Sequence, residues 1–309
     1  MDGILTMPLV LPPTVAGFCL LLLFSLKRPF GKFLLQNFEA MFLWNEKAIQ
    51  IVAGPCSVES EEQLFATARG LKKIGIQTLR GGIWKPRSRA HHFEGVGEPG
   101  LRWLQQVQQE LSMQVATEVA TPRQAEVALK YGIDILWIGA RTTVSPFMIQ
   151  EIAEVLRGGD TPVMLKNPVC PDLELWTGAV ERLLDIDLKQ LSLIHRGFSV
   201  LDAAPYRNIP CLEMALEMKK RFPGLPLFCD PSHICGKRGL LYGICAEALR
   251  LDMDGLFIES HCCPEVALSD AAQQLTPEAL GKMFENLGIR QVENNKLHLG
   301  CEILIQRKG

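Results

Sequence analysis

The sequence predicts a (β/α)8 barrel, the TIM-barrel class of α/β fold. Eight short runs of β-branched or apolar residues follow one another from Ile49 onward, and most are separated by amphipathic stretches. Eight strand–helix alternations within about 240 residues match this fold in count and length. A doubly wound open sheet is the structural alternative. No Gly-x-Gly-x-x-Gly sequence follows the first run, which weakens a dinucleotide-binding interpretation.

The expected strands and helices alternate in a regular order. The strand runs are Ile51–Ala53, Thr78–Leu79, Met113–Ala116, Ile135–Ile138, Val163–Leu165, Leu191–Ile194, Leu227–Phe228 and Leu256–Ile258. The clearest helical stretches are Glu61–Ile74, Pro122–Tyr131, Pro146–Leu156 and Glu213–Phe222. Because the active sites of such barrels lie at the carboxyl ends of the strands, the residues just after each run are the candidate functional residues.

Composition limits the classes of function. The 309 residues are 48% hydrophobic, enough to bury a large core, and carry a net charge of -2. That balance gives no overall basic field for nucleic acid, so any anion site must be a local cluster. Ten cysteines occur without regular spacing or a Cys-x-x-Cys pair. This usage is typical of free thiols in a reducing cytosol, and we expect a cytoplasmic protein.

The two ends of the chain fall outside the predicted barrel domain, which we place at residues 41–290. Residues 1–40 form an apolar extension, but its apolar stretch Thr14–Leu26 is shorter than the roughly 20 residues that span a bilayer. We expect this extension to be non-native or disordered, with Met41 as an alternative start, and a membrane anchor is the alternative. Residues 291–309 are expected to form a short C-terminal tail.

Cations follow the predicted strands at one end of the barrel. The segment Leu79–Ser88 places three of them beside two glycines and a proline, a combination that suits an anion better than a packed core. A solvated basic loop is the plain alternative for that segment alone. The cations at strand ends are Arg80, Lys85, Arg87, Arg141, Lys166 and Arg196. Because clustered like charges repel, the pattern predicts a site for phosphorylated substrates.

A second set of strand-end residues has the chemistry of a metal site. It consists of Cys56, His233, Glu259 and Asp270. A thiolate, an imidazole and two carboxylates suit a divalent transition ion such as Mn, Fe, Co or Zn. Taken singly, Cys56 is more often a small buried hydrophobe and Asp270 a helix N-cap. His261 is a rival ligand, but Glu259 is expected on the inward face of its strand.

Seven short motifs carry a resemblance to a known family. They are Gly-Pro-Cys-Ser at 54–57, Lys-Pro-Arg-Ser at 85–88, Ile-Gly-Ala-Arg at 138–141, Leu-Lys-Asn-Pro at 165–168, Ile-His-Arg-Gly at 194–197, Asp-Pro-Ser-His at 230–233 and Ser-Asp-Ala at 269–271. In this order they resemble type I 3-deoxy-D-arabino-heptulosonate 7-phosphate (DAHP) synthase, over about residues 49–290. The nearest likeness is to the synthase half of bifunctional DAHP synthase/chorismate mutase chains.

The resemblance implies a metal-dependent condensation of phosphoenolpyruvate with D-erythrose 4-phosphate and water, the first step of the shikimate pathway. It implies that the metal is held by Cys56, His233, Glu259 and Asp270. It implies that phosphoenolpyruvate is held by Arg80, Lys85, Ala140, Arg141, Lys166 and Arg196. Erythrose 4-phosphate would be held by Lys85, Pro86, Arg87 and Ser88, with Asp230 near its hydroxyls.

Lys85, Glu118 and His233 are the catalytic candidates. Lys85 lies between the two expected substrate sites and is the favoured proton donor to the new alkoxide. Glu118 is a candidate for positioning the water, and pairing with one of the arginines is the equally plain alternative. We further expect a homo-oligomer, with a separate chorismate mutase as a partner to be tested.

Two rival functions use the same fold. The first is 3-deoxy-D-manno-octulosonate 8-phosphate synthase, which acts on arabinose 5-phosphate. That family typically has Lys-Ala-Asn-Arg-Ser where this chain has Lys-Pro-Arg-Ser at 85–88, and the shorter motif suits a four-carbon sugar. The second is a non-catalytic barrel that binds a separate chorismate mutase, but all four metal-ligand candidates are present.

Overall fold

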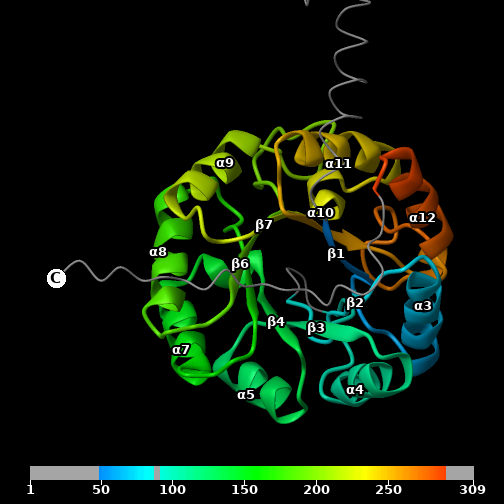
Figure 1. The fold of residues 1–309 in the computed structure, drawn as a ribbon, viewed down its shortest axis with the longest axis horizontal. Helices are drawn as coiled ribbons and strands as arrows, with labels where there is room; N and C mark the ends of the chain where they lie inside the picture. Colours follow the sequence, from blue (N-terminus) through cyan, green and yellow to red (C-terminus); the bar gives the residue numbers. More distant parts are fainter. Residues whose placement is uncertain (1–48, 87–90, 290–309) are drawn as a thin grey trace, which may run out of the picture. The chain divides into compact units, whose positions relative to one another are not determined.

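The expected barrel is present. The computed structural model describes residues 49–86 and 91–289, and in it eight parallel strands close on themselves in sequence order. Figure 1 looks along the barrel and shows the strands inside a ring of helices. The predicted (β/α)8 fold is therefore confirmed.

All eight predicted strand runs correspond to strands. The strands are β1 (Gln50–Gly54), β2 (Thr78–Arg80), β3 (Gln114–Val119), β4 (Ile135–Ile138), β5 (Val163–Lys166), β6 (Leu191–His195), β7 (Leu227–Cys229) and β8 (Gly255–Glu259). The barrel closes where β1 pairs with β8, from Gln50 opposite Gly255 to Gly54 opposite Glu259. This pairing brings the first and last strand ends together, although about 200 residues separate them in a fold of this size.

Helices lie between the strands. They are α3 (Glu61–Lys73), α4 (Pro99–Leu111), α5 (Pro122–Lys130), α6 (Ala140–Thr143), α7 (Pro146–Leu156), α8 (Leu173–Leu184), α9 (Leu212–Arg221), α10 (Pro231–Cys235), α11 (Leu241–Arg250) and α12 (Pro277–Asn286). The four predicted helical stretches agree with α3, α5, α7 and α9 to within one residue at each end.

Capping residues explain where several helices begin. The side chains of Ser60, Thr121, Ser145, Asp172 and Thr276 each accept a hydrogen bond from the backbone N–H three residues later. Such caps satisfy one of the N–H groups that the first helical turn leaves without a partner. The helices α5, α7 and α12 also begin with proline, whose missing N–H costs nothing at that position.

The barrel interior is filled by apolar side chains from β1 and from β3 to β8. Trp137 of β4 and Phe257 of β8 meet across it edge to face, with ring centroids 5.2 Å apart. Both are completely buried. The guanidinium of Arg80 lies 5.0 Å from the centroid of the Trp137 ring and 4.5 Å from that of Phe257. This aromatic pair is thus the boundary between the hydrophobic core and the charged end of the barrel.

Some expectations fall on residues that the structure does not describe. Residues 1–40 and 291–309, together with Arg87 and Ser88, lie outside the described residues, and what was expected of them stays a prediction. Within the described ranges, no helix is both long and apolar enough to cross a membrane. All eight cysteines of residues 49–86 and 91–289 are free thiols, as their spacing led us to expect.

Candidate active site

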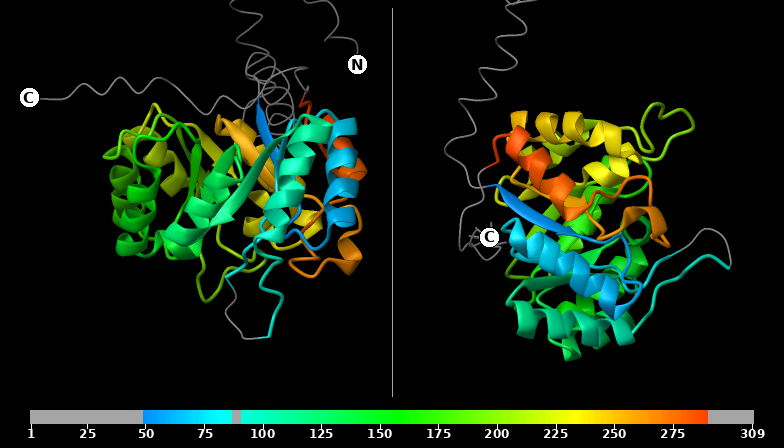
Figure 2. Two further views of the ribbon diagram at one scale, coloured as in Figure 1. Left: turned by 90° about the horizontal axis from the view of Figure 1, so that it is seen from below. Right: turned by 90° about the vertical axis from the view of Figure 1, so that its right-hand side faces the viewer.

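The strand-end residues line one cavity of about 640 Å³. The loops that follow β2 and β8 lie at the same end of the barrel (Figure 2). The predicted site residues on the cavity wall are Arg80, Lys85, Pro86, Glu118, Ala140, Arg141, Lys166, Arg196, His233 and Asp270. The barrel thus brings together residues from seven of its eight strand ends.

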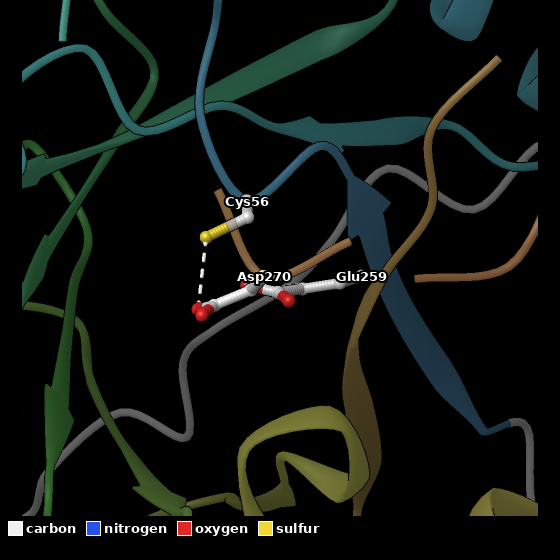
Figure 3. Close-up of side chains that lie close together, drawn as sticks. All are labelled: Cys56, Glu259 and Asp270. Atoms are coloured by element: carbon white, nitrogen blue, oxygen red, sulfur yellow. Dashed lines mark hydrogen bonds between the residues drawn. The ribbon is translucent and has the colours of Figure 1, made fainter. Parts of the chain in front are cut away.

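Three candidate metal ligands form a tight cluster. Single ligand atoms of Cys56, Glu259 and Asp270 all lie within 4.8 Å of one another. Figure 3 shows their side chains converging, with the Cys56 thiol donating a hydrogen bond to Asp270 Oδ2 at 3.3 Å. The fourth candidate, His233, places Nε2 3.7 Å from Glu259 Oε1 and 3.9 Å from Asp270 Oδ2. The predicted set of four is therefore close together in space.

The loop after β8 is tied to the loop after β1, which fixes this cluster. The backbone N–H of Cys56 donates to Gln274 Oε1 at 2.9 Å. The hydroxyls of Ser57 and Ser269 are 2.5 Å apart, and Glu59 accepts the backbone N–H of Leu268 at 2.8 Å. These bonds join segments that are more than 200 residues apart in the sequence. Because Ser269 and Gln274 flank Asp270, they hold its loop against Cys56.

His233 is placed by Asp230, the residue that caps α10. The backbone N–H of His233 donates to Asp230 Oδ1 at 3.0 Å. Its ring Nδ1 lies 2.8 Å from Asp230 Oδ2, although at an angle that does not make a hydrogen bond. Burial lowers the pKa of the imidazole, against the attraction of Asp230. A neutral imidazole beside a carboxylate is the form in which histidine binds metals.

The donor set fits a divalent transition ion. Burial, reinforced by the Glu259 carboxylate, raises the pKa of the Cys56 thiol. Burial would also raise the pKa of Asp270, but His233 and Arg207 hold it below its usual range. A thiol, an imidazole and two carboxylates that converge in this way can exchange the thiol proton for a metal ion. The chemistry expected from the sequence is therefore possible at this position.

His261 does not join the cluster. Its Nε2 faces Glu59 Oε2 at 3.7 Å, and its Nδ1 accepts the backbone N–H of Cys263 at 3.0 Å. The strand alternation that we used to choose between His261 and Glu259 does not separate residues two positions apart. What separates them in the structure is position, because Glu259 ends β8 within the cluster whereas His261 lies against Glu59.

Arg80 is the most deeply placed cation of the cavity. Its side chain is almost completely buried, and its Nη2 donates to Glu259 Oε1 at 3.2 Å. In the described part of the chain, its Nε and Nη1 have no hydrogen-bond partner. Buried N–H groups of a guanidinium that lack acceptors are costly unless an anion binds them. Arg80 therefore has the position and the open donors of an anion-binding residue.

Lys85 and Glu118 lie next to each other in the cavity wall. Lys85 Nζ lies 3.7 Å from a Glu118 carboxylate oxygen and donates to the Cys56 carbonyl at 3.0 Å. Burial would lower the pKa of Lys85, but the Cys56 sulfur and Glu118 together raise it. The ammonium form is therefore favoured. Gly139 gives Glu118 its room, because a Cβ at residue 139 would lie 2.0 Å from Glu118 Oε1.

Lys166 and Arg196 are buried cations with protein partners. Lys166 Nζ is 2.8 Å from Asp230 Oδ2, and Arg196 Nη1 donates to Asn208 Oδ1 at 2.8 Å. Burial lowers the pKa of Lys166 and lowers that of Arg196 to about 10. Asp230 is completely buried, and both its oxygens are engaged with Lys166 and His233. It is not among the residues lining the cavity, so its expected contact with a sugar stays a prediction.

The comparison with known families agrees with this geometry. The family model described as "DAHP synthetase I family" matches residues 35–292. The chain belongs to the DAHP synthetase I family. The resemblance to a type I DAHP synthase and the enzyme class that it implies are thereby confirmed.

Relatives of known name share most of this barrel. The phospho-2-dehydro-3-deoxyheptonate aldolase of Thermotoga maritima is 31% identical over 241 residues, which cover 77% of this chain and 68% of that protein. The crystal structure of that DAHP synthase superposes with a TM-score of 0.70 over 79% of this chain and 69% of the other. The 2-dehydro-3-deoxyphosphooctonate aldolase of Syntrophotalea carbinolica is 25% identical over 259 residues, which cover 77% of this chain and 89% of that protein.

Several residues that line the cavity of this DAHP synthetase I family member were not predicted from the sequence. Arg207 and Asn208 lie in the loop after β6, Ser199 and Val169 lie just past strand ends, and His92 lies in the loop after β2. Arg207 Nη1 donates to Asp270 Oδ1 at 3.0 Å. These residues lie in loops beyond the strand ends. Loop residues have no hydrophobic periodicity, so the sequence does not indicate which of them fold back toward the cavity.

Proposed function

We propose that this chain condenses phosphoenolpyruvate with D-erythrose 4-phosphate and water, giving DAHP and phosphate, in a reaction that needs a divalent metal ion. The supporting observation is a single cavity whose wall carries Arg80, Lys85, Lys166 and Arg196 beside the metal-ligand candidates His233 and Asp270. Cations of this number suit two phosphorylated substrates. Membership in the DAHP synthetase I family supports the same reaction.

In this proposal phosphoenolpyruvate binds the inner cations. Arg80 offers Nε and Nη1, which have no partner in the described chain, from the cavity floor. Lys85, Lys166 and Arg196 surround the same space, with Ala140 and Arg141 at the start of α6 on its wall. Fixed cations around a phosphate and a carboxylate hold the substrate in one orientation, and this arrangement accounts for much of the rate in a two-substrate reaction.

Erythrose 4-phosphate binds nearer the mouth of the cavity in this proposal. Lys85 and Pro86 line the cavity there, and Arg87 and Ser88 come next in the sequence. Asp230 is completely buried and bonded to Lys166, so in this proposal it orients the Lys166 ammonium near the sugar hydroxyls. The Lys-Pro-Arg-Ser motif sets the length of the aldose that fits.

The metal site consists of Cys56, His233, Glu259 and Asp270, and Mn, Fe, Co or Zn would suit it. When bound, such an ion supplies Lewis-acid polarisation of the aldehyde. C3 of phosphoenolpyruvate forms a bond to the aldehyde carbon, water adds at C2, and phosphate leaves from C2. Lys85 donates the proton to the new alkoxide oxygen, and Glu118, 3.7 Å from it, positions the water. His233 contributes by orienting the cluster in its neutral form.

We also propose a cytoplasmic homo-oligomer that acts on these small molecules and binds no nucleic acid. The free thiols and the balanced charge support this interpretation. A separate chorismate mutase is the proposed protein partner, on the likeness of the motifs to bifunctional chains. Copurification with a mutase, or a change in turnover when a mutase is added, is the expected result.

An assay of both aldoses tests the proposed reaction. Loss of phosphoenolpyruvate and release of phosphate are measured with erythrose 4-phosphate and, separately, with arabinose 5-phosphate. We expect faster turnover of erythrose 4-phosphate, abolition by a chelator, and recovery when Mn²⁺ or Co²⁺ is added back. Arg80→Met is expected to lose activity, whereas Arg221→Ala, which removes a surface ion pair with Glu174, keeps it.

Each alternative gives a different result in the same assay. Faster turnover of arabinose 5-phosphate would assign the chain to 3-deoxy-D-manno-octulosonate 8-phosphate synthase, the activity that the Syntrophotalea relative's name describes. No turnover of either sugar, with any of the four metals, would favour a non-catalytic barrel. Full activity after exhaustive chelation would contradict the metal requirement.

A further inference from the structure

Two polar side chains outside the four metal-ligand candidates connect the two carboxylates of that site. Arg207 Nη1 donates to Asp270 Oδ1 at 3.0 Å and to Gln273 Oε1 at 2.9 Å. Gln273 Nε2 in turn donates to Glu259 Oε2 at 2.7 Å. A continuous hydrogen-bonded chain therefore runs from Asp270 through Arg207 and Gln273 to Glu259.

This chain of bonds engages one oxygen of each carboxylate and leaves the other facing the cluster. Asp270 uses Oδ1 for Arg207, while its Oδ2 accepts the thiol hydrogen of Cys56 at 3.3 Å. Glu259 uses Oε2 for Gln273, while its Oε1 accepts a hydrogen bond from Arg80 Nη2 at 3.2 Å and lies 3.7 Å from His233 Nε2. Without the bridge, Asp270 would keep only the bond from the Cys56 thiol and Glu259 only the bond from Arg80. Each carboxylate could then rotate more freely about its terminal bond, since such torsions are broad.

Gln273 is held by burial and Arg207 by its backbone, although the Arg207 side chain is 43% exposed. Gln273 is 1% exposed, and the two hydrogen bonds of its side chain both belong to the bridge. The backbone N–H of Arg207 donates to the Ile234 carbonyl at 3.0 Å, at the end of α10. Gly236 ends that helix at a φ of 64°, and a Cβ there would lie 2.6 Å from Arg207 Cβ. The glycine thus leaves the space that the arginine stem occupies.

We propose that Arg207 and Gln273 are positioning residues that orient Asp270 and Glu259 for metal binding. The inference rests on the proposed metal site and adds to it two residues outside the expected ligand set. Partners behind the ligands of a metal typically change its affinity by about 10- to 100-fold when they are removed. Gln273 is uncharged, so its effect on affinity comes from orientation alone, whereas the charge of Arg207 also repels a metal ion.

The test measures metal binding directly. Chelator-treated protein is titrated with Co²⁺ in competition with a chromophoric chelator, and the cobalt–thiolate absorption band of Cys56 is recorded. Gln273→Leu and Arg207→Met keep the bulk of each side chain and remove the bridge. We expect each to weaken Co²⁺ binding by about 10- to 100-fold and to alter the thiolate band. The double variant should lose less than the product of the single losses, because both changes break one bridge.

Arg238→Met is the matched control. Arg238 holds the same loop through the carbonyls of Ala271 and Gln274, at 2.8 and 2.7 Å, but bonds to neither ligand carboxylate. It should keep Co²⁺ affinity close to that of the unaltered protein. Thermal unfolding of each metal-free variant checks that the barrel is intact.

Several outcomes would overturn the inference. Unchanged Co²⁺ affinity in Gln273→Leu would remove the orienting role, and tighter binding in Arg207→Met would mean that charge repulsion dominates. A loss in Arg238→Met equal to that in Arg207→Met would assign the effect to loop order. An effect of Arg207→Met confined to the KM for phosphoenolpyruvate would make Arg207 a substrate contact. Failure of the unaltered protein to bind Co²⁺ would overturn both this inference and the metal dependence of the proposed function.

Discussion

Asp230 supports two functional groups of the site at once. Its Oδ2 lies 2.8 Å from Lys166 Nζ and 2.8 Å from His233 Nδ1, and its side chain is completely buried. Burial would raise the pKa of this carboxyl, but His233 and Lys166 hold it well below its usual range. A buried ion pair of this kind is strongly destabilising when one partner is removed, because the other charge is left without compensation.

We therefore expect Asp230→Asn to lower the free energy of unfolding by about 3 kcal/mol or more. The change leaves the Lys166 ammonium buried without a carboxylate, and the pKa of Lys166, already lowered by burial, should fall further. Urea denaturation measures the difference. Glu154→Gln is the control, because the pair of Glu154 with Arg157 is half-exposed and should contribute less than about 1 kcal/mol. Equal losses in the two variants would contradict the prediction.

The turn between β4 and α6 determines where the side chain of Glu118 can lie. Gly139 has ordinary helical-cap backbone angles, with φ -74° and ψ 155°, so its backbone would accept another residue. Its side-chain position is instead filled by Glu118, which belongs to β3. The glycine is required by a neighbouring strand rather than by the turn.

Gly139→Ala should consequently impair turnover more than folding. The new Cβ would push Glu118 away from Lys85, and a displacement of about 1 Å in a catalytic group can cost about 100-fold in rate. Steady-state kinetics and thermal unfolding separate the two effects. Gly243→Ala in α11 is the matched control, because nothing lies within 4 Å of its added Cβ and alanine favours a helix. Normal turnover in Gly139→Ala would show that Glu118 does not need its present position.

The same elements show what the sequence could and could not predict. Short apolar runs located all eight strands, because most strand residues are buried and apolar in a parallel barrel covered by helices. The strand-end rule then located Arg80, Lys166 and Glu259. Arg207 and Gln273 were missed because they lie on loops whose path depends on long-range contacts, such as the bond of Arg207 to the Ile234 carbonyl. No local pattern records a contact of that kind.

The stability of the whole barrel depends on pH through one buried histidine. His195 ends β6, is completely buried, and packs between Trp176 and Phe198. Burial lowers its pKa from 6.5 to about 4. Between these two values the unfolded chain binds a proton that the folded protein excludes. The contribution of His195 to stability is therefore fully present above pH 6.5 and is lost as the pH falls toward 4.

We expect this one residue to reduce the free energy of unfolding by roughly 3 kcal/mol over that interval. Urea denaturation at a series of pH values gives the slope for the unaltered protein and for His195→Gln, which cannot take up the proton. The variant should be less stable at neutral pH, yet lose less stability on acidification. Parallel slopes in the two proteins would assign the acid sensitivity to other groups.

The pairing of β1 with β8 also has a consequence for synthesis of the protein. Cys56 emerges early from the ribosome, but Glu259 and Asp270 emerge only after almost the entire barrel has been made. For most of its translation, a nascent chain therefore presents the Cys56 thiol without the carboxylates of Glu259 and Asp270. The proposed set of ligands is complete only when the last strand has closed the ring. At the proposed site, binding of a metal ion by all four side chains would therefore have to wait for the synthesis of β8 and of the loop that carries Asp270.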